Sequence, residues 1–278
     1  MTVLSGREIA ACIRRETGER AAELNERGGP PRLAVVVATD DGGSAWYVGS
    51  IARAAEKVGV ACDVVDLDAD ASTKVIADRL DELGRDPKVH GIILQTPLPK
   101  GVSAPELAER IPVDKDVDGA NPASLGRLAA GLTAFAPATA EAVVTILEHH
   151  EVALEGAEVA VVGRSTVVGK PLAHLLLDRN ATVTVCHSRT RDLPEVTSRA
   201  HVLVAAVGRP ALIGADHVRP GAVVVDVGTN PTEDGGLVGD VDADAVSERV
   251  GALTPVPGGV GPVTTALLLR HTVDAASR

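Results

Sequence analysis

Aromatic side chains are nearly absent from this chain of 278 residues, which has one Trp, one Tyr and one Phe. Hydrophobic residues still make up 45% of the sequence and charged residues 23%, a balance that allows a buried core and excludes wholesale disorder. The core must therefore be packed mainly by Ala, Val and Leu, whose small side chains let helices and strands approach closely. Because bulk packing requires few aromatics, the single tyrosine, Tyr47, is informative.

Positive charge is also in short supply, with 27 Lys and Arg against 38 Asp and Glu and a net charge of −11. Nucleic acids and anionic membranes attract basic surfaces, so we expect neither a nucleic acid nor a membrane as a partner. The N-terminus MTVLSGREIA has no basic segment followed by an apolar one, and no run of about 18 apolar residues occurs. We therefore expect a cytoplasmic protein.

Cysteine is scarce as well. Cys12, Cys62 and Cys186 form an odd-numbered set without metal-ligand spacing, which predicts reduced thiols and no metal site. Cys186 lies in the apolar run TVTVC, where a buried, unreactive thiol is expected.

Helical and strand periodicities alternate along the whole chain, a pattern typical of parallel sheets with crossover helices. We expect Ser5 and Glu8 to form a capping box at the start of the first helix, and Ser44 to cap the second. The segment 112–128 is rich in Pro, Asp, Gly and Asn, and we expect a long functional loop there. In the first half we expect helices over 5–26, 44–58 and 72–85, and strands over 32–40, 62–67 and 89–95.

The second half continues the pattern after a joining helix over 137–150. Its last segment is expected to form a helix with an apolar stripe at Val263, Leu267 and Leu268. The fold class predicted is thus α/β with two domains. In this half we expect a helix over 169–179 and strands over 157–163, 181–187, 200–208, 222–228 and 251–256.

The stretch VAVVGRSTVVGKPLAHLLL indicates a dinucleotide site. A buried strand ends at Gly163 and a helix opens near Gly169, which places free N–H groups and the positive end of a helix dipole where a pyrophosphate could sit. The spacing departs from G-x-G-x-x-G, because Ser165 stands where a middle glycine is usual. Such a turn is also compatible with a purely structural role, but Arg164 and Ser165 in this context favour a nucleotide.

The next strand bears on which dinucleotide binds. In NAD sites an acidic residue about 20 positions on accepts a hydrogen bond from the ribose 2′-hydroxyl. Here the segment CHSRTR has no acid, and Ser188, Arg189 and Arg191 follow the strand. Cations beside hydroxyls suit a 2′-phosphate, so we predict NADP in preference to NAD. The alternative is that both arginines are merely solvated.

Seven blocks in fixed order resemble the methylenetetrahydrofolate dehydrogenase/cyclohydrolase family. They are GIILQTPLP, DKDVDGANP, VVGRSTVVGKP, TVTVCHSRT, LVAAVGRP, PGAVVVDVGTN and TPVPGGVGPVT. The resemblance implies a three-layer α/β folate domain over 1–136 plus 262–278, a Rossmann-like parallel-sheet NADP domain over 137–261, and a folate cleft between them. It implies hydride transfer from 5,10-methylenetetrahydrofolate to NADP and, in bifunctional members, hydration to 10-formyltetrahydrofolate. The family is typically a homodimer.

The resemblance also assigns roles to residues that match the family. Asp118 falls at the pterin-anchoring aspartate, and a carboxylate can accept two hydrogen bonds from a 2-amino-pyrimidinone edge. Gln95 matches the active-site glutamine, and Tyr47 matches the tyrosine that packs near the folate. The remaining matches are Pro257, Gly258 and Gly259 for the substrate, and Gly163, Arg164, Ser165, Ser188, Arg189 and Thr229 for the cofactor.

One departure bears on activity. The family's helix carries Tyr-x-x-x-Lys, but here the lysine position holds Ile51, four residues after Tyr47. An amine is needed there to manage protons in the hydrolytic step, and Ile has none. The guanidinium of Arg53, two residues on, is essentially never deprotonated. We therefore expect the dehydrogenase to survive and the cyclohydrolase to be weak or absent.

Three alternatives stay open from the sequence alone. The enzyme could be fully bifunctional, with another group in place of the lysine; Lys57 is the nearest amine on the same helix. It could be a non-catalytic folate- and NADP-binding homologue, although Asp118, Gln95 and both cofactor strands argue against this. It could also be a dehydrogenase for another substrate, because Thr96 and the turn APATAE at 136–141 also depart from the family.

Overall fold

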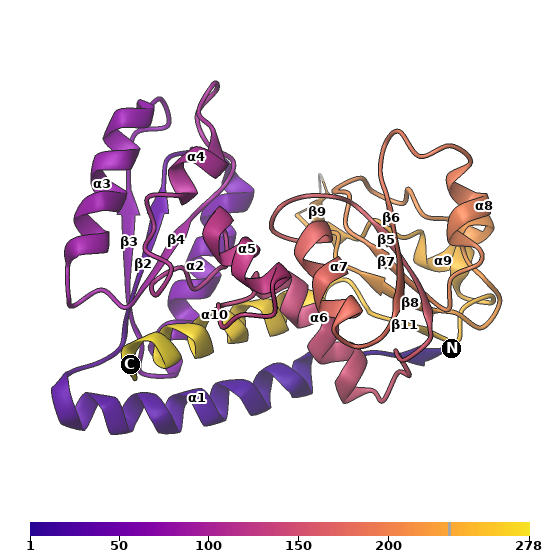
Figure 1. Ribbon diagram of the computed structural model, residues 1–278, viewed down its shortest axis with the longest axis horizontal. Helices are drawn as coiled ribbons and strands as arrows, with labels where there is room; N and C mark the ends of the chain where they lie inside the picture. The colour runs from indigo at the N-terminus through magenta and orange to yellow at the C-terminus, as the bar shows by residue number, and fades with distance from the viewer. Residues whose placement is uncertain (233–234) are drawn as a thin grey trace. The chain divides into compact units, whose positions relative to one another are not determined.

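The computed structural model describes residues 1–232 and 235–278. It divides into two compact units, each built on a parallel sheet (Figure 1). The six-stranded unit comprises Met1–Ala10 and Thr139–Thr264, and the three-stranded unit comprises Ala11–Ala138 and Thr265–Arg278. The first ten residues thus lie in the six-stranded unit, whereas we expected them in the N-terminal domain.

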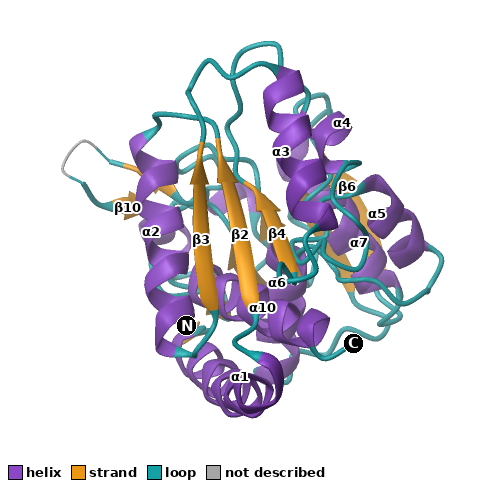
Figure 2. Cartoon of the chain, turned by 90° about the vertical axis from the view of Figure 1, so that its left-hand side faces the viewer, coloured by secondary structure: helices purple, strands orange, loops and turns teal. Residues whose placement is uncertain are grey.

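The three-stranded unit has strands β2 (Arg32–Val37), β3 (Ala61–Asp66) and β4 (Gly91–Leu94), in the order β3-β2-β4. All are parallel, and Val35 of the central strand pairs with Val64 and Ile93. Helices α2 (Gly42–Lys57) and α3 (Thr73–Arg85) lie on opposite sides of this sheet in Figure 2. With both faces covered, β2 is an almost continuous apolar run, as its sequence RLAVVV predicts.

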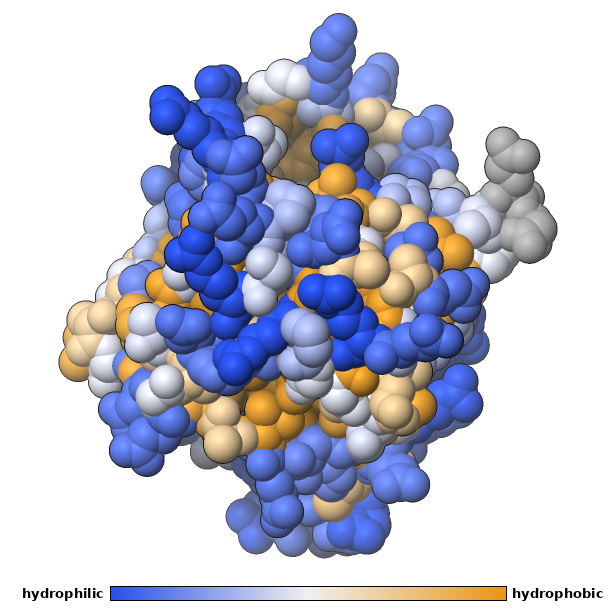
Figure 3. All heavy atoms as spheres, turned by 90° about the vertical axis from the view of Figure 1, so that its right-hand side faces the viewer, coloured by the Kyte–Doolittle hydropathy of each residue, from blue (hydrophilic) through white to orange (hydrophobic). Residues whose placement is uncertain are grey.

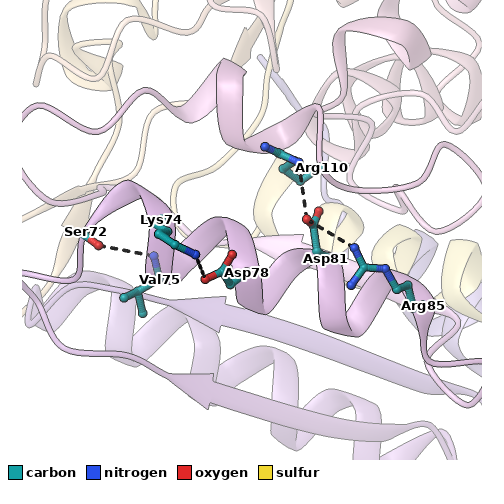
Figure 4. A network of polar contacts seen from close by, with 7 residues as sticks. All are labelled: Ser72, Lys74, Val75, Asp78, Asp81, Arg85 and Arg110. Atoms are coloured by element: carbon teal, nitrogen blue, oxygen red, sulfur yellow. Dashed lines mark hydrogen bonds and ion pairs between the residues drawn. The ribbon is translucent and has the colours of Figure 1, made fainter.

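Helix α3 buries one apolar stripe. Ile76, Leu80 and Leu83 recur at helical spacing and pack against one face of the sheet, together with α4 (Ala104–Ala108). The helix begins after Ser72, whose Oγ accepts the N–H of Val75 at 3.4 Å. Its outer face carries the ion pair of Lys74 with Asp78, and Asp81 lies between Arg85 and Arg110 (Figure 4). Exposed pairs of this kind contribute little stability each.

Two predicted helix starts are wrong. Helix α1 spans Arg7–Gly28 and not 5–26, and Ser5 Oγ accepts the N–H of Arg7 at 3.3 Å. Helix α2 is capped by Asp41, whose Oδ2 accepts the N–H of Ser44 at 2.7 Å, so Ser44 lies inside the first turn. Asp and Ser are nearly equivalent as caps, and the run DDGGS offers both within four residues.

The expected loop at 112–128 contains a helix. Helix α5 spans Pro122–Ala129, with Asn121 as its cap and Pro122 in its first turn. The eight-residue helix is too short to carry a clear period, and the Asp- and Gly-rich segment before it hides its start. The loop proper therefore ends at Asn121.

The six-stranded unit contains β5 (Glu158–Val162), β6 (Thr182–Cys186), β7 (Val202–Ala205), β8 (Val223–Asp226), β11 (Ala252–Leu253) and β1 (Thr2–Val3). Their order is β1-β11-β8-β7-β5-β6, and all pair in parallel. After β5 the chain passes to β6 on one side and then to β7 on the other, so the strand order reverses at β5. This is the Rossmann-like arrangement that the sequence predicts, and its ligand site is expected at the carboxyl end of β5.

The sequence missed the short strands. β1 has two residues and pairs with β11 across almost the whole chain, Thr2 with Ala252. An antiparallel pair, β9 (Asn230–Pro231) with β10 (Leu237–Val238), was also not expected. Segments of two residues carry no period that could reveal them.

The helices of this part of the chain are α6 (Ala138–His149), α7 (Gly169–Leu177), α8 (Leu193–Thr197), a 3₁₀ turn (Ala215–His217), α9 (Ala243–Val246) and α10 (Val260–Ala276). In α10 the predicted stripe of Val263, Leu267 and Leu268 is buried, but Leu269 and Val273 are buried too, so this helix is enclosed on most sides. Figure 3 shows hydrophilic residues over much of one face, with apolar ones between them. Among the described residues, no helix is both long and apolar enough to cross a membrane.

Candidate active site

The turn after β5 can be made only with glycine. Gly163 has a φ of +136°, and a Cβ there would lie 2.2 Å from the carbonyl oxygen of Ala206 at the end of β7. A Cβ on Gly169, the first residue of α7, would lie 2.0 Å from the carbonyl oxygen of Gly163. The glycines therefore let strand and helix approach closely at the point where the strand order reverses.

Arg164 and Ser165 are exposed on this turn. Ser165 is tied to the helix that follows, because its Oγ accepts the N–H of Val168 at 3.1 Å and its carbonyl accepts the N–H of Lys170 at 3.1 Å. Serine in place of the usual middle glycine thus closes the turn by a side-chain hydrogen bond. The exposed guanidinium next to it supplies positive charge at the amino end of α7.

The turn after β6 lies beside the first one, because the N–H of Gly163 donates to the carbonyl of Cys186 at 2.9 Å. Two hydrogen bonds close this second turn. The N–H of His187 donates to Thr190 Oγ1, and the N–H of Thr190 donates to the His187 carbonyl. Ser188, Arg189 and Arg191 are exposed on or just after it. Within residues 1–232 and 235–278, no carboxylate pairs with Arg164, Arg189 or Arg191, so their charges are available to an anionic ligand.

Two buried aspartates organise the loops after β7 and β8. Asp240 is fully buried and accepts the backbone N–H groups of Val207, Gly208 and Arg209 at 2.6, 3.0 and 2.9 Å. It also accepts the side-chain N–H of Asn230 at 3.0 Å. One carboxylate therefore joins the loop after β7 to the loop after β8.

Asp226 completes the arrangement. It accepts the N–H groups of Gly228, Asp240 and Val241 at 2.9, 2.9 and 3.0 Å. Burial raises the pKa of Asp226, against these hydrogen bonds. A Cβ on Gly239 would lie within 1.8 Å of the carboxylate, so the close approach needs a glycine. Thr229 is exposed between residues that the two aspartates hold.

The segment Pro257–Gly259 lies in the six-stranded unit. The carbonyl of Gly258 accepts the N–H of Gly6 at 3.0 Å, and Gly258 has a φ of +113°. The bond between Val256 and Pro257 is cis, as is that between Thr96 and Pro97 beside Gln95. The structure thus places these predicted substrate residues in the unit that also carries the turn at Gly163.

In the three-stranded unit the structure brings Tyr47 and Asp118 close together. Tyr47 is partly buried on α2, one helical turn after Ser44, and its hydroxyl is hydrogen-bonded by the side chain of Thr265. Burial, and then the charge of Asp118, raise the pKa of Tyr47. The phenol is therefore neutral across the physiological range and keeps a proton that it can donate.

Gln95 is linked to α2, the helix that carries Tyr47, through the carbonyl of its neighbour Thr96. Its Nε2 donates to the carbonyl of Thr96 at 2.7 Å, and the Oγ of Ser44 donates to that carbonyl at 3.2 Å. The loop after β4 is thereby attached to the first turn of α2. Gln95 itself sits at the carboxyl end of β4, where its N–H donates to the carbonyl of Val36 at 2.9 Å.

Two of the carboxyl groups in the loop between α4 and α5, those of Asp116 and Asp118, are shielded from solvent. Asp116 is fully buried and accepts the N–H groups of Ala120 and Asn121 and the hydroxyl of Ser124, at 2.9, 2.9 and 2.6 Å. Asp118, partly buried, accepts the N–H of Ala138. Burial, followed by the charge of Asp116, raises the pKa of Asp118 to about 7.

Ile51 is 0% exposed and belongs to the buried stripe of α2 with Val48 and Ala55. It lies one turn from Tyr47 on the same side of the helix. The position is therefore an apolar part of the core, next to the predicted folate residues.

Sequence reasoning missed four groups: Asp240, Asp226, Thr265 and His271. His271 is buried on α10, and its Nδ1 lies 2.8 Å from the carbonyl oxygen of Val117, next to Asp118. A lone histidine on a largely apolar helix was the one signal available for it. For the aspartates the signal was equally thin, because Asp226 ends the apolar strand β8 and Asp240 follows Gly239 in a loop, and neither sequence context shows what the carboxylate contacts.

Two family models match the chain. One, described as tetrahydrofolate dehydrogenase/cyclohydrolase, catalytic domain, matches residues 4–118, and the other, the NAD(P)-binding domain of the same family, matches residues 137–278. Among curated proteins, the bifunctional protein FolD 1 of Saccharopolyspora erythraea is 66% identical over 275 residues, which cover 99% of this chain and 94% of that protein.

Solved structures agree with these matches. A bifunctional FolD methylenetetrahydrofolate dehydrogenase/cyclohydrolase from Campylobacter jejuni superposes with a TM-score of 0.95 at 40% identity, covering 100% of this chain and 99% of that one. A Trypanosoma brucei methylenetetrahydrofolate dehydrogenase-cyclohydrolase, complexed with NADP cofactor and inhibitor, gives a TM-score of 0.94 at 33% identity, covering 100% and 98%.

Proposed function

The chain belongs to the tetrahydrofolate dehydrogenase/cyclohydrolase family, and from that membership we propose that it is a dehydrogenase in which the cyclohydrolase step is weak or absent. It is an enzyme of one-carbon metabolism that uses NADP and a tetrahydrofolate substrate. The observation that carries the proposal is the apolar, fully buried Ile51 at the position of the family's lysine.

The residues present in the six-stranded unit fit NADP. A Cβ at Gly163 would collide with the carbonyl of Ala206, so this turn requires glycine, and Arg164 and Ser165 are exposed on it beside the amino end of α7, where a pyrophosphate could sit. Arg189 and Arg191 follow the adjacent strand without a carboxylate partner among the described residues, which suits a 2′-phosphate. The turn at Gly163 together with Arg189 and Arg191 would hold NADP, which would supply the hydride acceptor for the methylene carbon of the folate.

We assign substrate binding in the three-stranded unit to Asp118, Gln95 and Tyr47. The ionised carboxyl of Asp118 accepts two hydrogen bonds from the 2-amino-pyrimidinone edge, which fixes the pterin. The neutral phenol of Tyr47 packs beside the ring, with its hydroxyl held by Thr265. Orientation of this kind is the main demand that hydride transfer makes on the protein.

Hydrolysis makes a further demand that these residues do not meet. A water must lose a proton as it attacks the methenyl carbon, so a base within reach is required. Ile51 offers no proton acceptor, and the raised pKa of Tyr47 keeps its phenol from acting as one. The second candidate, full bifunctionality, is favoured by the names of the relatives, which are called bifunctional.

A comparison of Ile51→Lys with Ile51→Met tests the proposal. The wild-type protein should oxidise 5,10-methylenetetrahydrofolate with NADP+ faster than with NAD+, yet hydrolyse 5,10-methenyltetrahydrofolate no faster than buffer does. Burial lowers the pKa of a lysine amine, so Ile51→Lys should place a neutral base at the site and raise hydrolysis at least about tenfold, since a well-placed acid–base group contributes about 10²–10⁴-fold.

Ile51→Met is the matched control, because it has similar length and no amine. It should keep the dehydrogenase and leave hydrolysis at the buffer rate. Enzymatic hydrolysis by the wild-type protein would refute the proposal and establish the bifunctional alternative.

The remaining assignments concern assembly and location. We propose a homodimer, as is typical of the family. The exposed edge strand β6, with Val185 37% exposed, is a surface that a second copy could cover. Light scattering should give twice the 28.4 kDa of one chain; a monomer mass would contradict this.

A cytoplasmic location, proposed from the acidic composition and reduced cysteines, is tested by cell fractionation.

A further inference from the structure

One titratable side chain contacts the loop that carries Asp118 and has no role in the activity described above. His271 lies on α10 and is 4% exposed. Its Nδ1 is 2.8 Å from the carbonyl oxygen of Val117, the residue between Asp116 and Asp118. A carbonyl can only accept, so Nδ1 carries a proton and donates it. The imidazole is thereby held against the segment that positions Asp118.

The ring is fixed on a second side. The ring centroids of Phe135 and His271 lie 5.0 Å apart. The ring of Phe135 also contacts Arg278, whose guanidinium carbon lies 4.6 Å from the ring centroid. The loop cannot retreat easily either, because a Cβ on Gly91 would lie 2.9 Å from Val117. His271, Val117 and β4 are therefore closely packed, and a change at His271 is transmitted to the loop.

Charge couples the same groups. His271 acts on both carboxyl groups and lowers the pKa of Asp116 and of Asp118, against the stronger effect of burial. The titratable and charged groups on the surrounding elements are Asp116, Asp118 and Lys115 on the loop, Tyr47 on α2, Arg270 and Asp274 on α10, and Arg278 at the chain end.

We propose that His271 is a positioning residue for the folate site, which holds Asp118 in place through Val117 and keeps it ionised through its own positive charge. The inference rests on the proposed role of Asp118. A pyrimidinone edge needs an acceptor, so folate binds the carboxylate and not the protonated acid. The charge of Asp116 raises the pKa of Asp118, and His271 lowers it, so His271 opposes the repulsion between the two carboxyl groups.

The test separates charge from position. His271→Asn keeps an amide N–H that can donate to the Val117 carbonyl, but it cannot become positive. His149→Asn is the matched control, an exposed histidine on α6. Binding of 5-formyltetrahydrofolate, which has the same 2-amino-4-oxo edge, and kcat/KM for 5,10-methylenetetrahydrofolate at saturating NADP+ are followed from pH 6 to 9.

In His271→Asn the acid limb of both profiles should move to higher pH by about one unit, so that at pH 6.5 affinity falls about tenfold and at pH 9 by less than about twofold. Binding of NADP+ should not change, and His149→Asn should match the wild type throughout. A role in packing alone would lower affinity equally at every pH. Superimposable profiles for His271→Asn and wild type, or such a uniform loss, would overturn the proposal.

The variant Asp118→Asn separates the role assigned to Asp118 from the role assigned to His271. If it binds the folate as tightly as wild type, the role assigned to Asp118 fails. If it loses binding at every pH while His271→Asn keeps the wild-type profile, the role of Asp118 stands and only that of His271 fails. Should His271→Asn not fold, as judged by urea unfolding, His271→Gln is the second neutral amide and is measured in the same way.

Discussion

A substitution of Asp240 tests which contacts hold the loops of the six-stranded unit together. Its carboxylate is fully buried and accepts four N–H donors, three from Val207–Arg209 and one from Asn230. A buried donor left without a partner costs about 1–3 kcal/mol. Four such donors set a range of about 4–12 kcal/mol for Asp240→Ala, and we expect about 4 kcal/mol, because water can reach loops of this kind once the side chain is gone.

Asp242, two residues on, is the matched control. It is the cap of α9 and accepts a single N–H, that of Ala245, at 3.1 Å. Loss of one helix cap costs about 1 kcal/mol. Asp240→Ala should therefore lower the free energy of unfolding about four times as much as Asp242→Ala, when both are measured by urea unfolding with far-UV circular dichroism.

The same change should act on the cofactor. The loops that Asp240 joins follow β7 and β8 at the carboxyl edge of the sheet, and one of them carries Thr229. The milder Asp240→Asn keeps one acceptor oxygen, so it should fold while weakening NADP+ binding, and leave binding of 5-formyltetrahydrofolate near the wild-type value. Equal unfolding energies for Asp240→Ala and Asp242→Ala would refute the account of Asp240.

Three further predictions follow from the geometry. Replacing both Arg189 and Arg191 with Ala should weaken NADP+ far more than NAD+, by about 10-fold or more, as separate titrations would reveal; equal losses would contradict the 2′-phosphate assignment. Gly163→Ala would drive a Cβ into the Ala206 carbonyl, so NADP+ binding measured by calorimetry should be lost. Because the raised pKa of Asp118 makes the folded protein retain a proton that the unfolded chain releases, this group destabilises the fold as pH rises from about 4 to 7. Asp118→Asn should remove that loss, and urea unfolding at pH 5 and 8 would detect it.

The fold class was predictable because its signals are long and periodic. Strands such as β2 and β5 are buried on both faces and read as continuous apolar runs, and the glycine turn at Gly163 follows one of them directly. The reversal of strand order at β5 then confirms the predicted two-domain α/β fold with a Rossmann-like sheet. Predicted site residues inside such blocks needed no knowledge of distant parts of the chain.

The features that sequence analysis did not predict share a cause, because each depends on contacts between residues that are far apart in the sequence. Strand β1 exists only because Thr2 meets Ala252. His271 matters because α10 returns to the loop at Val117, 154 residues away. Asp240 reaches Val207 over 33 residues, and nothing in its own neighbourhood distinguishes it from Asp242. Local pattern can locate an acid or a histidine, but only tertiary structure shows what it holds.

The way the chain is shared between the two units also constrains its synthesis. Residues 1–10 complete the six-stranded unit, and residues 265–278 complete the other, so each unit needs a terminus made far from the rest of it. At about 5–20 residues per second, Thr2 emerges from the ribosome about 12–50 s before its partner Ala252. The six-stranded unit cannot complete its sheet before Ala252 is translated, and the other unit cannot complete its core before residues 265–278 are translated. A nascent chain that stopped before Ala252 would therefore expose two unfinished cores at once.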